Sequence, residues 1–431
     1  GRPGADGRLD VLLGGTGVSD PEHEPGRAAT DRVPAPAGRT RALTALCITE
    51  VTSWGVLYYA FPVLLVALTR STGWSTAQAI GAFSTGALVA AAASVPVGRL
   101  IDSRGPRVVM TSGSVLGVLA VVAIAAAPGL GWFYLAWALA GLAQAATLYP
   151  PAFAALTGWY PPAGRIRALT TLTLAAGLAS TVFAPLTAAL LGALSWRQTY
   201  LVLAGVLALV TIPLHACCLT PRWPGRRQRD PAVRAEDLAH SASVLRSRPF
   251  LVLVAVMALT GFGSYAATIN LVPLLTGRGY STGFAAWALG LVGVGQVLGR
   301  TGYGALARRS STRVRTAVIP AAAAVCVAAL GLLPGPAAAL IALAVLAGAA
   351  RGAHTLLQAS AVADRWGTRA FGRVNGVFSA PITAAIALAP AGGTLVADRV
   401  GGYPTGFAVL AALTALASLA ALATDPPRAP T

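Results

Sequence analysis

Apolar stretches separated by short polar turns follow one another along most of the chain. Many of these stretches have about 20 residues, the length that an α-helix needs to cross the ~30 Å hydrocarbon core of a bilayer. Gly, Pro and Arg residues mark where one stretch ends and the next begins. We therefore predict membrane spans at 43–69, 76–98, 108–127, 132–157, 168–192, 197–219, 249–275, 283–306, 316–333, 337–361, 374–397 and 403–424.

A polar interruption at 220–248 divides the twelve predicted spans into two sets of six. Such a division indicates two halves that are related as structural repeats. We expect an all-α membrane protein whose 12 transmembrane helices form two six-helix, pseudo-symmetric bundles. The first bundle is predicted at 41–219 and the second at 249–424, with 220–248 as the linker between them.

Both ends of the chain lie outside the predicted bundles. Residues 1–40 are rich in Gly, Pro, Arg and Asp and contain little that can be buried, so we expect this segment to be disordered. It lacks the apolar core and the cleavage site of a signal peptide. Residues 425–431 are predicted to be a short tail.

Composition and charge place the protein in a membrane and give it an orientation. The chain is 55% hydrophobic and only 11% charged, whereas soluble domains carry about 25% charged residues. Nineteen arginines lie in the loops after even-numbered spans, and the opposite loops hold four, namely Arg70, Arg197, Arg278 and Arg399. Basic residues accumulate in cytoplasmic loops, so we expect a multi-pass protein of the cell membrane with both termini and the linker in the cytoplasm. The same bias explains the net charge of +18 without a nucleic-acid partner.

Neither an enzyme nor a metal or cofactor site is expected. The four cysteines Cys47, Cys217, Cys218 and Cys326 lie in or at the ends of apolar stretches, at spacings unlike those of a disulfide framework or a zinc site. The sequence has no phosphate-binding glycine loop and no nucleophile–base pair at usable spacing.

The loop after the second span has the sequence GRLIDSRGPRVV, in which Gly98, Asp102, Gly105 and Arg107 stand out. The glycines allow a tight turn and a close approach of helices, and Asp102 can accept hydrogen bonds from a helix N-terminus or from an arginine. This loop resembles the signature of the major facilitator superfamily, whose fold has the two bundles predicted above. The equivalent loop of the second half has Arg308 where the acid would stand.

Three further segments resemble the monocarboxylate transporter branch of that superfamily, with its oxalate/formate-antiporter-like bacterial members. These segments are YYAFPVLL in the first span, the block Leu169–Ala204 with its Ser-Trp-Arg turn, and LGLVGVGQVLGRTGYGALA in the eighth span. The resemblance implies that Arg300 holds a substrate carboxylate. The acid that precedes this arginine by four residues in the branch is Gln296 here, and the lysine that some animal members carry in the first span is Val63. Coupling to protons by the animal scheme is therefore not expected.

Only three charged side chains lie well within the predicted spans: Glu50, Arg300 and Arg351. A charge at the bilayer centre costs ~2.5–3.5 kcal/mol on insertion scales, so we expect all three to face a hydrated cavity or one another. Two arginines suit a small anionic substrate. Glu50 is either a carboxyl that loads and releases a proton, or the partner in a static ion pair or internal hydrogen bond that orients the first span.

Other polar residues of the spans are candidates for the same cavity. On an α-helix Ser53, Trp54, Tyr58 and Phe61 lie on the same broad face as Glu50, and Arg351, His354 and Gln358 form a polar stripe. The predicted substrate-binding residues are Arg300, Arg351, Tyr58, Gln296, His354, Asn270, Gln144 and Tyr149, with Glu50 as the candidate for proton coupling.

The sequence favours a monomeric secondary active transporter for a small organic anion of the monocarboxylate type, working by alternating access and driven by ion or substrate gradients. An exporter of a drug-like or secondary-metabolite compound is the alternative, because Gly177 and Pro185 of the fifth span weakly resemble an antiporter motif. A sensor built on a transporter scaffold is a third class, but such proteins carry an added domain that the short linker and tail do not provide.

Overall fold

The structure, a computed structural model, describes residues 38–223 and 231–425 of the 431-residue chain. Almost all of the segment predicted to be disordered (1–40) lies outside the described residues, as do seven residues of the predicted linker and the tail from 426 on.

The first bundle comprises α1 (Arg39–Trp54), the π-helix η1 (Gly55–Tyr59), α2 (Ala60–Thr72), α3 (Thr76–Arg104), α4 (Pro106–Ala125), α5 (Leu130–Thr147), α6 (Tyr149–Trp159), α7 (Pro162–Ala176), α8 (Ala179–Ala193) and α9 (Trp196–Cys218). The linker contains α10 (Pro231–Arg246). The second bundle comprises α11 (Arg248–Ile269), α12 (Leu271–Gly277), α13 (Thr282–Arg309), α14 (Thr312–Leu332), α15 (Ala337–Trp366), α16 (Phe371–Arg399), α17 (Tyr403–Ala420) and the 3₁₀ turn η3 (Ala421–Ala423).

Each predicted span falls on one helix or on consecutive helices. Within the described residues, ten helical segments are long and apolar enough to cross a membrane; α5 with α6, and α13, occupy the places of the two remaining predicted spans. Some spans are interrupted: α5 gives way to α6 at Leu148, just before Pro150 and Pro151, and α7 gives way to α8 at Gly177. Proline explains the first break, because it lacks an N–H and disfavours helical geometry in the residue before it.

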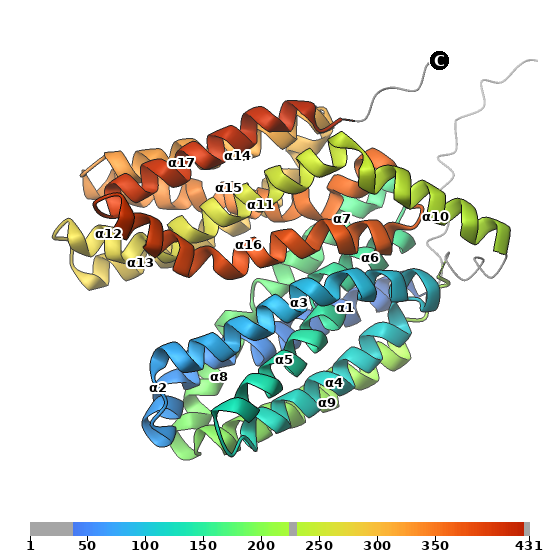
Figure 1. Ribbon diagram of the computed structural model, residues 1–431, viewed down its shortest axis with the longest axis horizontal. Coiled ribbons are helices and arrows are strands. Elements are labelled where there is room, and N and C mark those ends of the chain that lie inside the picture. Colours follow the sequence, from blue (N-terminus) through green and yellow to red (C-terminus); the bar gives the residue numbers. More distant parts are fainter. Residues whose placement is uncertain (1–37, 224–230, 426–431) are drawn as a thin grey trace, which may run out of the picture. The chain divides into compact units, whose positions relative to one another are not determined.

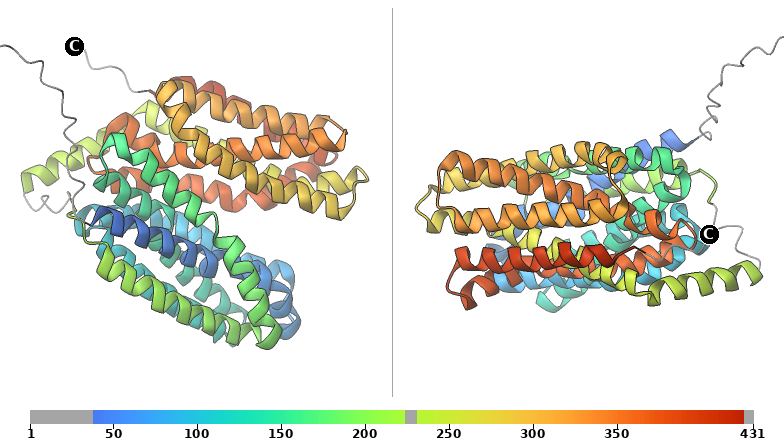
Figure 2. Two further views of the ribbon diagram at one scale, coloured as in Figure 1. Left: turned by 180° about the vertical axis from the view of Figure 1, so that it is seen from behind. Right: turned by 90° about the horizontal axis from the view of Figure 1, so that it is seen from above.

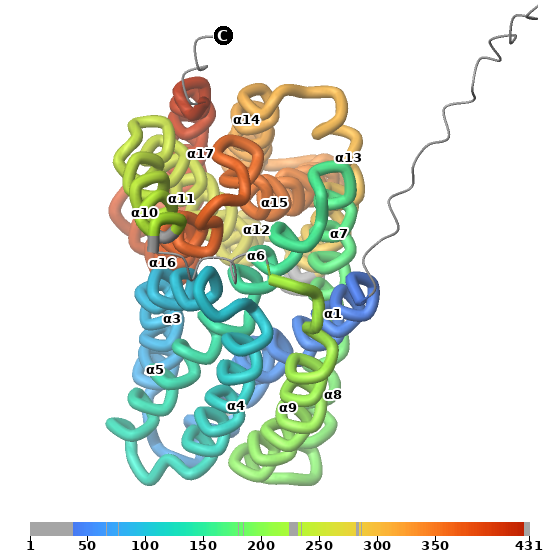
Figure 3. Tube along the Cα trace, turned by 90° about the vertical axis from the view of Figure 1, so that its right-hand side faces the viewer, coloured from blue at the N-terminus to red at the C-terminus, as the bar shows by residue number. Residues whose placement is uncertain are grey.

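The two bundles meet along α3 and α16, which pack against each other over most of their length (Figure 1). Seen end-on, α3 and α16 lie next to each other where the two bundles meet (Figure 3). α7 packs on α1 of the first bundle and also reaches α13 and α15 of the second, whereas α8 packs on α1, η1 and α2 of the first bundle. The fifth span therefore passes from the boundary into the first bundle (Figure 2). The bundles are joined at the end that holds α6, α7 and α10 and diverge toward α2 and α12 (Figure 1). We call the joined end the Asp102 end, after the residue at the end of α3.

Three large apolar clusters form most of the interior of the part of the chain that the structure describes. One lies within the first bundle around Phe61, Trp137 and Tyr200, and a second lies within the second bundle around Leu274 and Phe407. The third, at the Asp102 end, contains residues of both bundles: Leu46, Ile101, Met110, Phe153, Trp159, Phe250, Met257, Leu356 and Phe378. Because this cluster is shared, closure at the Asp102 end buries apolar surface that separation of the bundles would expose.

Of the four arginines in the loops that contain few arginines, two donate hydrogen bonds to carbonyl oxygens at the C-terminal ends of membrane helices. Arg197 donates to the carbonyl oxygens of Ala125 (2.6 Å) and Ala127 (2.8 Å) at the end of α4. Arg278 donates to those of Leu330 (2.7 Å) and Leu333 (2.8 Å) at the end of α14, and also to that of Gly331. A helix C-terminus leaves carbonyls unpaired and carries partial negative charge, which explains why arginine is kept here against the overall charge bias.

Candidate functional site

Arg300, on α13, reaches from the second bundle to the first. Its Nη1 donates to the carbonyl oxygen of Thr173 in α7 at 2.6 Å, and the residue is only 7% exposed. A Cβ at Gly177, where α7 ends, would lie 2.9 Å from the same nitrogen, so glycine provides the room for the guanidinium. The Nε of Arg300 has no hydrogen-bond partner among the described residues. Since a guanidinium has five N–H groups, Arg300 retains donors for a further ligand.

Arg351, on α15, lies against the ring of Tyr265 on α11. The guanidinium carbon is 3.7 Å from the ring centroid, a cation–π contact within the second bundle. Arg351 is half-buried, and its Nε has no hydrogen-bond partner among the residues that the structure describes. Tyr58 and Tyr59 of the first bundle lie within electrostatic range of it. This arginine therefore lies near the boundary between the bundles.

Four tyrosines surround the two arginines. Tyr58 and Tyr59 come from η1, Tyr149 from the start of α6 and Tyr265 from α11, and all four are half-buried. Tyr149 is within electrostatic range of Arg300, Tyr59 and Tyr265, and Tyr265 is within range of both arginines. We call Tyr58, Tyr59, Tyr149, Tyr265, Arg300 and Arg351 the Tyr–Arg cluster. Both bundles contribute to it.

The π-helix η1 explains why the sequence identified only one of the two adjacent tyrosines. A π-turn holds an extra residue, so the two ends of the first span are rotated relative to the α-helical register. Gln144 of α5 donates from Nε2 to the carbonyl oxygen of Leu57 within η1 (2.9 Å), so its amide supports the π-helix. Gly55 packs directly on the ring of Phe183, which a Cβ at this position would overlap.

The rotation also corrects the expected position of Phe61. An unbroken α-helix would place Phe61 on the face of Glu50, toward the cavity. Instead Phe61 is 3% exposed, stacks on Phe83 with ring centroids 4.6 Å apart and packs edge-on against Trp137 at 5.2 Å. The expectation for Phe61 is wrong, because the extra residue of η1 turns its side chain into the core of the first bundle.

Glu50 is fully buried, at 0% exposed, and belongs to no ion pair among the described residues. Neither carboxylate oxygen has a hydrogen-bond partner of ordinary geometry there, although the indole of Trp54, one turn along, approaches it. Tyr149 is within electrostatic range of both Glu50 and Arg300. Glu50 thus lies near Tyr149 of the Tyr–Arg cluster and, among the described residues, forms no salt bridge to either arginine.

A buried network that the sequence did not indicate lies beside Glu50. His215 of α9 joins Thr49 of α1 through Nε2 (2.9 Å) to Ser114 of α4 through Nδ1 (2.8 Å). The network ties three helices of the first bundle together next to the acid. No sequence signal was available, because the three residues are far apart in the chain and each is unremarkable in its own span.

Two of the other predicted binding residues lie within the second bundle. His354 is buried beside Gly261 of α11, and its Nε2 has no hydrogen-bond partner among the described residues. Arg351 lies one turn away on α15. Asn270, at the junction of α11 and α12, donates to Ala266 (2.9 Å) and accepts from Thr394 of α16 (3.0 Å). Its amide therefore holds the break in the seventh span.

Gln296 lies one turn before Arg300 on α13 and is half-buried. Its backbone packs on Gly352 of α15. The predicted residues that lie near the bundle boundary are Arg300, Arg351, Tyr58 and Tyr149. Gln144 and Asn270 instead support helix irregularities.

Asp102 bridges the two bundles. It does so by accepting hydrogen bonds from a helix N-terminus, one of the two kinds of partner that the sequence suggested. Its carboxylate accepts from the backbone N–H groups of Gly372 (2.7 Å) and Arg373 (2.6 Å), in the first turn of α16. One turn earlier, a Cβ at Gly98 would overlap the carbonyl oxygen of Gly372, so α3 and α16 touch backbone to backbone. We call Gly98, Asp102, Gly372 and Arg373 the α3–α16 latch.

The remaining residues of the motif shape the turn that follows. Gly105 has φ = +83°, a conformation that favours glycine, and begins α4. Trp223, just after α9, donates its indole N–H to the carbonyl oxygen of Asp102 (3.3 Å) and packs on Gly105 and Gly158. Arg107 is exposed, and so is Arg308 in the second half. Of these, Trp223 is the residue that the motif did not indicate.

The linker helix α10 is held by the second bundle. Glu236 and Asp237 accept from Arg369, in the turn before α16, at 2.8 and 2.5 Å. These hydrogen bonds raise the pKa of Arg369 above its ordinary value, so its guanidinium stays charged. Asp237 is also within electrostatic range of Asp102. The linker therefore has one end, Trp223, on the first bundle and the other, α10, on the second.

Replacing Asp102 with asparagine tests the latch. The amide keeps one acceptor oxygen but presents N–H to the second backbone donor, and the charge that suits a helix N-terminus is lost. An unpaired buried donor costs about 1–3 kcal/mol. A loss of this size in the joined state shifts the equilibrium between joined and separated bundles about 5–150-fold toward separation. Spin labels on cysteines at Ser103 and Thr368, in a background without the native cysteines, are expected to show longer distances in Asp102→Asn. Asp398→Asn, at the other end of α16, is the control; identical distance distributions in all three proteins would contradict the role of Asp102.

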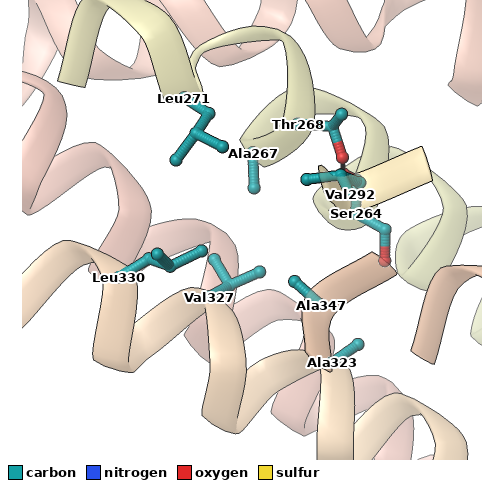
Figure 4. A pocket seen from close by; sticks show the side chains of 9 residues that line it. All are labelled: Ser264, Ala267, Thr268, Leu271, Val292, Ala323, Val327, Leu330 and Ala347. Atoms are coloured by element: carbon teal, nitrogen blue, oxygen red, sulfur yellow. Dashed lines mark hydrogen bonds between the residues drawn. The ribbon is translucent and has the colours of Figure 1, made fainter. Parts of the chain in front are cut away.

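A small cavity lies apart from this site, inside the second bundle (Figure 4). It is lined mainly by apolar side chains, with Ser264 and Thr268 as polar members. The Ser264 hydroxyl has no hydrogen-bond partner among the described residues. The cavity contains none of the predicted binding residues.

An all-helical fold with two joined bundles of long apolar helices defines a multi-pass membrane protein. Residues 46–340 match the Major Facilitator Superfamily, and the chain belongs to this family. Its members and the similar solved structures are transporters, which confirms that the chain is not an enzyme.

Comparison with known proteins gives both sequence relatives and similar structures. Monocarboxylate transporter 13 of Bos taurus is 27% identical over 61% of this chain, and an uncharacterized 38 kDa protein of Thermoproteus tenax is 33% identical over 51%. The chain covers 58% of the length of each. The transporter FucP, in the outward conformation, superposes with a TM-score of 0.71 at 16% identity, over 89% of this chain and 99% of FucP. The human organic anion transporter MFSD10 gives the same values. These structures show the fold, and the relatives confirm the resemblance to monocarboxylate transporters.

Proposed function

We propose that the protein is a secondary active transporter that moves a small organic anion of the monocarboxylate type across the cytoplasmic membrane by alternating access. One observation carries the proposal: Arg300 and Arg351 lie buried or half-buried at the bundle boundary, and neither is paired with a carboxylate among the described residues. Removing a charge from water costs several kcal/mol unless it is compensated. A bound carboxylate supplies that compensation with bidentate geometry. The relationship to monocarboxylate transporters supports the same ligand class.

The contacts across the boundary support alternating access. The bond from Arg300 to Thr173 and the bonds from Gly372 and Arg373 to Asp102 all join one bundle to the other. Rocking of the bundles about a central site requires these bonds to break and re-form. A substrate carboxylate at Arg300 competes with Thr173 and so couples binding to the movement.

Glu50 is proposed to take part in proton coupling. An ionised carboxylate that is fully buried without a partner is costly, so the protonated acid suits the conformation with the Asp102 end closed. Opening at this end is expected to hydrate Glu50 and release its proton toward that side. The excess of arginines at the Asp102 end supports a cytoplasmic location for this end, for both termini and for the linker. All residues of the Tyr–Arg cluster come from one chain, so a monomer is the proposed functional unit.

The thermal unfolding of the purified protein tests the ligand class. A ligand that binds only the folded state stabilises it by about 2.7 kcal/mol at 100 times its Kd. Sodium salts of aliphatic and aromatic monocarboxylates are compared with their neutral amides and with alkylammonium ions at equal ionic strength. Stabilisation by at least one carboxylate and by none of the amides is expected. A melting temperature that rises only with amines or neutral compounds would rule out an anion carrier and favour an exporter of another substrate class.

A further inference from the structure

We propose that the transported anion carries an aromatic ring, so that the substrate is an aromatic monocarboxylate rather than a short aliphatic acid. This inference rests on the proposed function and concerns the part of the ligand that the arginines do not hold. It follows from the aromatic side chains that the first bundle presents opposite the two guanidinium groups.

These side chains form a continuous aromatic wall of Trp54, Tyr58, Tyr59 and Tyr149. The ring of Trp54 lies 5.1 Å from that of Tyr149 and 5.4 Å from that of Tyr58, and the rings of Tyr58 and Tyr59 are 5.2 Å apart. They come from separate parts of the chain: α1, η1 and the start of α6. The π-helix brings both tyrosines of the pair to this wall.

The wall differs from the aromatic packing found elsewhere in the same bundle. Phe61 and Trp137 belong to a closed aromatic cluster and are 3% and 1% exposed. All four residues of the wall are half-buried, although they lie away from the ends of their membrane spans. The hydroxyls of Tyr58, Tyr59 and Tyr149 form no hydrogen bond to another side chain among the described residues. Phe83 packs on Tyr58 and Phe153 stacks on Tyr149. The hydroxyl groups and the ring surface that these two residues do not cover are left available for a ligand.

Charge and aromatic surface are arranged on opposite sides of the boundary. Arg300 and Arg351 belong to the second bundle, and Tyr59, in the wall, lies within electrostatic range of both. The face of an aromatic ring is negative and its edge positive, so a carboxylate is disfavoured against the wall whereas a neutral ring stacks on it. A ligand with a carboxylate at one end and a flat ring at the other matches both sides. Cations, which also bind aromatic faces, are repelled by the two unpaired guanidinium groups.

A pair of ligands of nearly equal size tests the inference without any mutation. Benzoate and cyclohexanecarboxylate have the same carboxylate and six-membered ring, but only benzoate is aromatic and flat. Stacking on one or two rings of the wall is expected to make benzoate bind at least about 10-fold more tightly, measured by titration calorimetry of the purified protein. Acetate and lactate are expected to bind more weakly than either. Equal Kd values for benzoate and cyclohexanecarboxylate, or tighter binding of lactate, would overturn the inference and leave the anion transporter intact. Absence of binding by every carboxylate would overturn both proposals.

Variants then locate the selectivity in the wall. Trp54→Leu is expected to reduce the ratio of the two Kd values to about 1–3 by removing the ring that contacts both Tyr149 and Tyr58, while cyclohexanecarboxylate still binds. Trp287→Leu on α13, where the tryptophan is 72% exposed, is the matched control and is expected to keep the full ratio. Tyr58→Leu serves as a second variant if Trp54→Leu does not fold. A benzoate preference that survives in both Trp54→Leu and Tyr58→Leu would contradict the assignment to the wall.

Discussion

Arg300→Ala is expected to lower carboxylate uptake into proteoliposomes by at least about 100-fold, with little change in melting temperature. The guanidinium is one of the two positive charges at the bundle boundary and still has free N–H groups beyond its bond to Thr173. Hydrogen bonds to a charged group contribute about 1.5–3 kcal/mol each, so loss of a bidentate pair weakens binding by roughly 10²–10⁴-fold. Stability is expected to change little, because the variant removes a buried charge together with a single hydrogen bond. Uptake is measured with a carboxylate that stabilises the wild-type protein.

Two variants of the same helix separate the position of the charge from its mere presence. Arg308→Ala removes an exposed arginine from the end of α13 and is expected to leave uptake unchanged. Arg300→Lys keeps the charge without the planar fork and is expected to retain only part of the activity. Wild-type uptake by Arg300→Ala would refute the role of Arg300 in anion binding.

Gly98→Val is expected to reduce uptake at least about 10-fold by preventing closure at the Asp102 end. Even a Cβ at this position would overlap the carbonyl oxygen of Gly372, which belongs to the backbone of α16 and cannot turn aside as a side chain can. Overpacking of this kind costs about 1–3 kcal/mol. The cost falls on the joined state alone, so the equilibrium moves about 5–150-fold toward separated bundles. Spin labels at Ser103 and Thr368 are expected to report longer distances, together with the loss of uptake.

Gly302→Val on α13 is the control for inserting a β-branched residue into a membrane helix. A Cβ at Gly302 meets no atom within 4 Å, so the variant is expected to keep the wild-type distances and uptake. The prediction for Gly98 fails if Gly98→Val transports at the wild-type rate, or if both valine variants lose activity equally.

The helices of the fold were predictable because lipid imposes a simple requirement on sequence. A span must be apolar over its whole length, and turns between spans concentrate Gly, Pro and Arg, so each predicted span coincides with one or more helices. The break before α6 was visible in Pro150 and Pro151. The π-helix η1 was not, because GVLYY suits an α-helix as well, and Gln144, whose amide supports it, is 87 residues away.

The candidate site was predictable where the type of a single residue, such as an arginine within a membrane span, was enough to indicate its surroundings. Arg300 and Arg351 are exceptional in lipid, and the structure places both at the bundle boundary. The sequence indicated that Asp102 can accept hydrogen bonds from a helix N-terminus. It did not indicate which helix, because the partners Gly372 and Arg373 lie about 270 residues further on. The acceptor of Arg300 is a backbone carbonyl, which any residue at 173 provides, so no sequence signal exists for it.

The π-helix has a consequence for how this protein is compared with its relatives. A π-turn holds one residue more than an α-helical turn, so a homologue with a regular helix here is expected to align with a gap inside 55–59. Deleting one codon within this segment would restore a regular helix and swing Glu50 by roughly 100° relative to α2. The orientation of the buried acid relative to the aromatic residues that follow it is thus set by the number of residues in one helical turn. An insertion or deletion in this turn changes that orientation more than any substitution does.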